Sequence, residues 1–180
     1  MAKGQAQDLL PVGQQEDYAD LLAWRKAQGL AEQPDVVIVS NSLDIPLTAL
    51  EKLQGRKISV LTGSAASAEN IDRLKQAGVY LTVFATDSVT GRGLKQWLIQ
   101  SDYRSAYMIA GPEVHRTLLA ERMLDRLFLT THLTLLGENR FHTLLSGTLE
   151  SAVKLRLESM YFDQSEVNSQ LFVQYALQQG

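Results

Sequence analysis

Short apolar runs alternate with amphipathic segments along most of this chain. The run at residues 36–40 is continuous and β-branched, which favours a strand buried on both faces. The segments between the runs repeat apolar residues at helical spacing. The pattern predicts strands over residues 36–40, 57–62, 79–85, 106–110 and 127–136, helices over 17–29, 67–77, 93–101 and from 112 onward, and a short helix or turn over 46–53.

The C-terminal part of the chain changes to an alternation of apolar and polar residues. Val153, Leu155 and Leu157 alternate with charged residues, and residues 170–177 alternate as well. Such alternation is typical of antiparallel strands with one solvated face. We therefore expect a hairpin whose turn lies at residues 163–168. The predicted fold class is α/β, a three-layer sandwich with a mostly parallel sheet and a C-terminal antiparallel hairpin. Residues 1–33 are predicted to be an N-terminal arm and helix, and residues 34–180 one α/β domain.

One strand–helix–strand unit stands at the centre of this pattern. The run 106–110 stops at Gly111-Pro112, a helix follows, and the run 127–136 ends at Gly137. A glycine turn between strand and helix presents backbone N–H groups and the positive end of the helix dipole. We expect a phosphate-bearing ligand there; the alternative interpretation is a plain crossover connection that binds nothing.

Composition narrows the classes of function. The chain has 180 residues, 45% of them hydrophobic, and a formal net charge of -3. Without a basic patch, nucleic acid is not expected as a partner. The absence of cysteine excludes disulfides, thiolate metal sites and a cysteine nucleophile, and fits a cytoplasmic protein. No signal peptide and no run of about 20 apolar residues is found, so no membrane association is expected.

The histidines do not suggest a metal site. His115, His132 and His142 do not lie at a metal-binding spacing, so no metal is predicted. His115 falls in the first turn of the helix after Gly111, either close to a bound phosphate or at an ordinary surface position. His132 falls within a predicted strand.

Glycine and hydroxyl residues cluster where the predicted strands end. In a parallel sheet these ends share one edge, where loops bind ligands. The alternative interpretation is turn chemistry, in which serine and glycine satisfy local backbone groups. Neither a dinucleotide-binding glycine fingerprint nor a P-loop is present. The three clusters are Thr62-Gly63-Ser64, Gly111-Pro112-Glu113 and Leu136-Gly137-Glu138.

The order of several motifs carries a family resemblance. DVVIVSNSLDIP, KISVLTGS, VYLTVF, IAGPEVHRTLL and MLDRLFLTTHLTLLG follow one another, with the predicted hairpin after them. Over about residues 34–177 the chain resembles the C-terminal reductase domain of the bifunctional riboflavin-biosynthesis deaminase/reductase and its stand-alone pyrimidine-reductase relatives. The resemblance implies a dihydrofolate-reductase-like fold and an NADPH-dependent oxidoreductase. Its substrate would be a small pyrimidine or pterin-like molecule, and its assembly a homodimer.

The resemblance also implies positions for the cofactor. Thr62, Gly63 and Ser64 would face its adenosine-phosphate end. Backbone N–H groups around Ala110, Gly111, Pro112 and Glu113 would meet the pyrophosphate near the nicotinamide, and Leu136 and Gly137 would border the same cleft. No catalytic residue is implied. The choice between NADPH and NADH stays open, because no Arg or Lys stands in the turn at Thr62.

Two departures from the family pattern leave a second class of function open. Ala110 stands where the family has a glycine, and its methyl group restricts the backbone where phosphate would approach. The family's opening strand, helix and glycine-threonine turn, which supply much of the substrate pocket, have no counterpart after Met1. The alternatives are therefore an active reductase, a non-catalytic nucleotide-binding or scaffold relative, and, more remotely, an unrelated flavodoxin-like domain.

Overall fold

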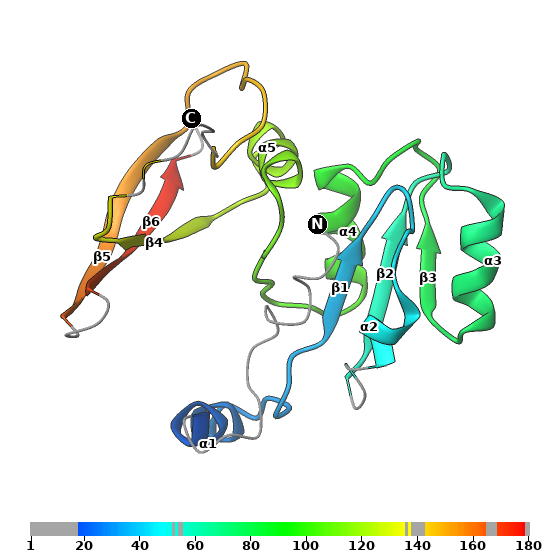
Figure 1. Cartoon of the computed structure of the whole chain (residues 1–180), viewed down its shortest axis with the longest axis horizontal. Coiled ribbons are helices and arrows are strands. Elements are labelled where there is room, and N and C mark those ends of the chain that lie inside the picture. The colour runs from blue at the N-terminus through cyan, green and yellow to red at the C-terminus, as the bar shows by residue number, and fades with distance from the viewer. Residues whose placement is uncertain are drawn as a thin grey trace. The chain divides into compact units, whose positions relative to one another are not determined.

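The computed structural model describes residues 18–51, 53, 56–135, 137, 143–164 and 169–178. The chain divides into two compact units, Met1–Val89 and Thr90–Gly180. Figure 1 labels the elements of both. The first unit contains α1 (Ala19–Ala27), β1 (Val36–Val39), α2 (Leu47–Glu51), β2 (Ile58–Thr62), α3 (Ala68–Gln76) and β3 (Tyr80–Val83). The second contains α4 (Gly91–Gln100), α5 (Pro112–Ala120), β4 (Arg126–His132), β5 (Lys154–Gln164) and β6 (Ser169–Gln178).

The first unit is built on a parallel sheet with β2 in the middle. The strand order is β1-β2-β3, with Val60 of β2 paired to Ile38 on one side and Leu81 on the other. Val60 and Leu61 are fully buried, as expected for a central parallel strand. Val60 packs in a cluster with Leu50 and Leu74, so α2 and α3 contribute to the core of this unit.

Helix ends in the first unit follow their sequence signals. The Ser67 hydroxyl caps α3 by accepting from the Asn70 N–H at 3.2 Å, and Gly78 ends the helix at a φ of +74°. Gly29 has a φ of +67° just after α1. A left-handed conformation at the C-terminal stop is the usual reason for glycine in this position. The helices predicted over 17–29 and 67–77 are therefore confirmed.

The loop after β1 holds a strained residue that the sequence did not reveal. Leu43 is fully buried and has a φ of +55°, a conformation that costs a non-glycine residue about 1–2 kcal/mol. Arg73 of α3 holds this loop, donating to the Leu43 carbonyl at 2.8 Å and to the Ile45 carbonyl at 3.1 Å. The buried leucine and the two hydrogen bonds offset the strain.

The second unit carries an antiparallel sheet in the order β4-β6-β5. Pairing of β5 with β6 confirms the predicted C-terminal hairpin; most of its expected turn lies outside the described residues. The register shifts between Leu157 and Ser159, which leaves Glu158 without a partner residue on β6. Such an extra residue is a β-bulge. The α/β class is thus confirmed, with the described strands divided between one parallel and one antiparallel sheet.

Two predictions about the central strand–helix–strand unit are wrong. Residues 106–110 form no strand, and Tyr107 and Ile109 are 81% and 58% exposed. The strand expected over 127–136 ends at His132 and pairs antiparallel with β6. An apolar run becomes a strand only where an edge is available to hydrogen-bond with it, and the segment 106–110 has no ladder partner among the described residues. Helix α5 itself begins at Pro112 as predicted.

Candidate functional site

The carboxyl ends of β2 and β3 lie side by side and are joined beyond the strands. The Phe84 N–H donates to the Thr62 carbonyl at 2.8 Å, and the Ser64 N–H donates to the Thr86 carbonyl at 2.8 Å. The turn after β2 is therefore fixed against the turn after β3. This is the sheet edge at which ligands of parallel α/β sheets bind.

Gly63 owes its identity to this close approach. A Cβ atom on Gly63 would lie 2.1 Å from the Asp87 carbonyl oxygen, 2.3 Å from the Asp87 carbonyl carbon and 2.5 Å from the Ser88 nitrogen. All three atoms belong to the backbone, so no side-chain rotation can make room. The space beside Gly63 is filled by the chain itself, so packing of the two turns requires a glycine here.

The three predicted residues of this turn differ in exposure. Thr62 is fully buried, and its hydroxyl oxygen has no hydrogen-bond partner within the part of the chain that the structure describes. Ser64 is exposed, and its hydroxyl donates to a carboxylate oxygen of Asp87 at 3.4 Å. Only Ser64 of the three presents its side chain to solvent, and it does so beside an acidic residue.

Asp87 was missed by the sequence reasoning. Asp87 is exposed and follows Thr86, whose hydroxyl donates to the Ser88 carbonyl at 2.7 Å. The signal was present, because a strand was predicted over residues 79–85 and polar residues follow it directly. The strand-end argument applied to the other turns would have pointed to this one as well.

In the second unit, the N-terminus of α5 is open. Gly111 is the N-cap, with an extended backbone and no side-chain hydrogen bond to the helix, and Pro112 starts the helix. Ala110, Gly111, Pro112 and Glu113 are exposed, and no described atom lies within 4 Å of a Cβ built on Gly111. Without a capping side chain, the first-turn N–H groups are directed toward this open side. The geometry suits an anion.

His115 lies behind this helix end rather than at the surface. It is 5% exposed, and its Nδ1 lies 3.2 Å from the Leu144 carbonyl oxygen. Since a carbonyl only accepts, this Nδ1 carries the proton. Of the two alternatives for His115, the ordinary surface position is wrong, because the side chain is buried and ties α5 to the loop at Leu144. His132 is exposed on β4, and His142 lies outside the described residues.

The third predicted turn is only partly described. Leu136 lies outside the described residues, and Gly137 is exposed with open space around it. Because β4 ends at His132, Gly137 is not the residue that terminates the strand. The predicted residues therefore fall into two groups, Thr62 to Ser64 in the first unit and Ala110 to Gly137 in the second.

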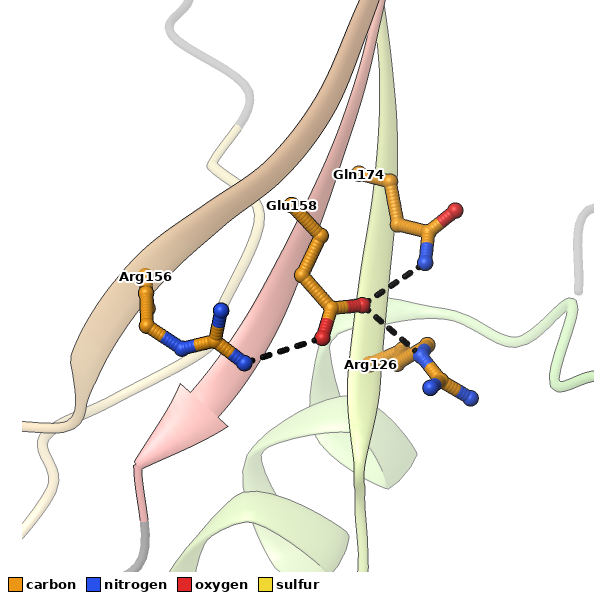
Figure 2. A network of polar contacts seen from close by, with 4 residues as sticks. All are labelled: Arg126, Arg156, Glu158 and Gln174. Atoms are coloured by element: carbon orange, nitrogen blue, oxygen red, sulfur yellow. Dashed lines mark hydrogen bonds and ion pairs between the residues drawn. The ribbon is translucent and has the colours of Figure 1, made fainter.

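The antiparallel sheet carries a charged network at its bulge (Figure 2). One carboxylate oxygen of Glu158 accepts from Arg126 at 2.9 Å and from Gln174 at 2.7 Å, and the other accepts from Arg156 at 3.1 Å. Hydrogen bonds from Arg126 and then Gln174 lower the pKa of Glu158, and the Glu158 hydrogen bond raises the pKa of Arg126. The network joins all three strands of this sheet.

Other kinds of site find little support. The described residues contain no group of three or more His, Cys, Asp or Glu side chains able to hold a metal ion. Among the helices they form, none is long and apolar enough to cross a membrane.

A hollow of about 400 Å³ lies at the amino end of the parallel sheet, lined by Ile58, Tyr80 and Arg56 among others. Arg56 donates there to the Pro34 carbonyl at 2.7 Å, and its burial lowers its pKa.

Comparison with known proteins finds solved structures to which the chain is similar. No curated protein sequence matches it. It is similar to a pyrimidine reductase-like protein from Corynebacterium diphtheriae, with 18% identity and a TM-score of 0.73 over 96% of this chain and 71% of that one. It is also similar to RibD from Acinetobacter baumannii in forms 2 and 1, at 18% identity, with TM-scores of 0.62 and 0.60. These matches cover 84% of this chain but only 40% and 39% of RibD.

At such identity the solved structures show the fold. The family is shown by a sequence model, which matches residues 10–168. This range begins upstream of residue 34, where the motif resemblance starts. It includes the turn at Thr62, the turn at Gly111, and strands β4 and β5 of the C-terminal sheet. The chain belongs to the RibD C-terminal domain family.

Proposed function

We propose that this chain is a reductase that takes a hydride from a reduced nicotinamide dinucleotide, NADPH by resemblance to its family. The observation that carries the proposal is the family match over residues 10–168. The proposed substrate is a pyrimidine of the kind reduced in riboflavin biosynthesis, 5-amino-6-(5-phosphoribosylamino)uracil, whose ribosyl group becomes a ribityl chain. The bound cofactor supplies the hydride. The chain supplies binding and orientation, which dominate a transfer of this kind.

The proposal places the cofactor's pyrophosphate at the start of α5. Two features support it: the first-turn N–H groups have no capping side chain, and the space over Gly111 is open. The helix dipole adds a partial positive charge at the same point. Glu113 in the first turn is exposed and can rotate away from a bound anion.

A fluorescence titration tests this placement. NADPH titrated into the purified chain should give a saturable signal, and Gly111→Asp should weaken binding at least about tenfold because a carboxylate would meet the pyrophosphate. Gln96→Glu is the matched control, since it adds the same charge at an exposed position of α4. Binding of neither NADPH nor NADH by the unmodified chain contradicts the reductase proposal. Equal losses in both variants contradict the placement at Gly111.

Two features favour the non-catalytic alternative. In the turn at Thr62 the threonine and the glycine are buried, and Ala110 stands beside Gly111 where the family has a glycine. A nucleotide-binding relative without activity would bind NADPH and leave it unoxidised when substrate is added. Following the absorbance of the reduced nicotinamide with the pyrimidine substrate present separates the two functions.

We further propose that the protein is a homodimer, as its family resemblance implies. One face of β5 carries large apolar side chains at alternate positions, interrupted only by the bulge, and they are 47–64% exposed. Covering such a face with a second copy removes apolar area from water. Sedimentation equilibrium should report twice the mass of one chain, and the Leu157→Glu variant should have the mass of a single chain. A monomer at micromolar concentration contradicts the proposal. The residues of this face are Leu155, Leu157, Met160 and Phe162.

A further inference from the structure

We propose that Asp87 makes the protein prefer NADH over NADPH by occupying the position where a 2′-phosphate would need a cation. This inference rests on the proposed function, because it concerns which nicotinamide dinucleotide the reductase would use. It departs from the form that the family resemblance implies. The argument uses only the first unit of the chain.

The position of Asp87 is fixed by the backbone around it. The Ser64 N–H bonds to the Thr86 carbonyl at 2.8 Å, and the backbone at Asp87 packs directly on Gly63. The Ser64 hydroxyl then donates to Asp87 Oδ1 at 3.4 Å. The carboxylate is therefore held at the turn that resemblance assigns to the adenosine end.

The pair Ser64–Asp87 faces solvent and retains binding capacity. Both residues are exposed. A carboxylate has two acceptor oxygens with about four lone-pair sites, and the serine hydroxyl occupies one of them. The remaining sites can accept hydrogen bonds from the ribose hydroxyls of a dinucleotide. A carboxylate on the ribose 2′-hydroxyl is how many dinucleotide-binding sheets select NAD, whereas an arginine accommodates the 2′-phosphate of NADP.

No cation in these two turns offsets the carboxylate. The segments TGSAA after β2 and FATDSVT after β3 contain neither Lys nor Arg. Arg73, which reaches the neighbouring loop after β1, donates to two backbone carbonyls there. The first turn of α3 adds a further acidic residue, Glu69. A 2′-phosphate would thus meet a carboxylate at this edge.

The expected discrimination is measurable. A 2′-phosphate carries between one and two negative charges near neutral pH. Repulsion by a carboxylate a few ångströms away, together with the lost ribose hydrogen bond, corresponds to a preference of the order of tenfold. Because the pair is exposed, the preference should shrink as salt is added.

The test is a pair of titrations, NADH and NADPH, into the full chain at low and high salt. The unmodified protein should bind NADH about tenfold more tightly. Asp87→Asn, which removes the charge and keeps the shape, should bring the two affinities to within about threefold, mainly by improving NADPH. Glu51→Gln is the control, since it removes an acidic charge at the end of α2 and should leave the ratio unchanged. Circular dichroism confirms that both variants fold.

The outcomes separate this inference from the function on which it rests. Tighter binding of NADPH, or a ratio that Asp87→Asn does not change, overturns the role of Asp87 and leaves the reductase proposal standing. Binding of neither cofactor overturns both. A ratio that falls equally in Asp87→Asn and Glu51→Gln assigns the preference to overall charge and also overturns the role of Asp87.

Discussion

Substitution of Gly63 by alanine tests the closest backbone contact in the first unit. The added methyl group would lie 2.1 Å from the Asp87 carbonyl oxygen and 2.5 Å from the Ser88 nitrogen. Each separation is about 1 Å shorter than an ordinary van der Waals contact. Since the obstructing atoms are backbone, one of the two turns has to move.

The cost of that movement has two parts. Inserting a methyl group into packed space typically costs about 1–3 kcal/mol. Moving the turns apart also weakens the hydrogen bonds from Ser64 to Thr86 and from Phe84 to Thr62, each worth about 0.5–1.5 kcal/mol. We expect Gly63→Ala to lower the free energy of unfolding by about 3 kcal/mol, a large part of the roughly 5–15 kcal/mol of a typical protein.

Urea unfolding followed by circular dichroism measures this loss, and two other glycines calibrate it. Gly78 has a φ of +74° and open space around it, so Gly78→Ala should cost only the conformational term, about 1 kcal/mol. Gly137 has open space and no positive φ, so Gly137→Ala should change stability by less than about 0.5 kcal/mol. A loss for Gly63→Ala no greater than that for Gly78→Ala would refute the proposed clash.

Three further predictions concern packing, capping and pH. Leu74→Ala, at a fully buried core position, should lower the free energy of unfolding by about 2–5 kcal/mol in urea titrations. Glu121→Ala should cost about 1 kcal/mol, because its carboxylate accepts from the Gly91 N–H at 3.0 Å and the Arg92 N–H at 2.9 Å at the start of α4; Glu121→Gln should recover part of that loss. The pKa of Glu158 is lowered from 4.5, so its contribution to stability is present above that value and is lost as pH falls through the lowered pKa. Urea midpoints measured against pH should therefore fall less below about pH 4.5 in Glu158→Gln than in the unmodified chain; parallel profiles would contradict the assignment.

Most of the fold could be predicted because local signals agree with the structure. Strand β1 has a continuous apolar run, α3 has Ser67 at its start and Gly78 at its end, and the hairpin strands alternate. The segment 106–110 misled because its residues have strand propensity but no adjacent edge to pair with among the described residues. Pairing is a property of two segments, and a single run of residues does not disclose its partner.

The candidate site was predicted in part for a similar reason. Position along the chain correctly placed Gly111 and Pro112 at a helix start and Thr62 at a strand end. Exposure was not readable from the sequence, because two hydroxyl residues of one segment differ: Thr62 at the end of β2 is buried and Ser64 in the turn after it is exposed. The polar residues after β3 were an available signal for Asp87, but its contact with Ser64 became visible only when the backbone brought the ends of β2 and β3 together.

The bulge at Glu158 keeps the apolar side chains of β5 on one face of the strand. In a regular ladder, each residue of this strand would alternate sides, and the spacing of Leu157 and Met160 would send them to opposite faces. Because Glu158 has no partner on β6, it does not count in the alternation of paired residues. Met160 therefore lies on the same side as Leu157. Deleting Glu158 would therefore keep the apolar face of the strand continuous while removing the charge that connects the three strands. Inserting a residue elsewhere in β5 would move the apolar side chains beyond the insertion to the opposite face.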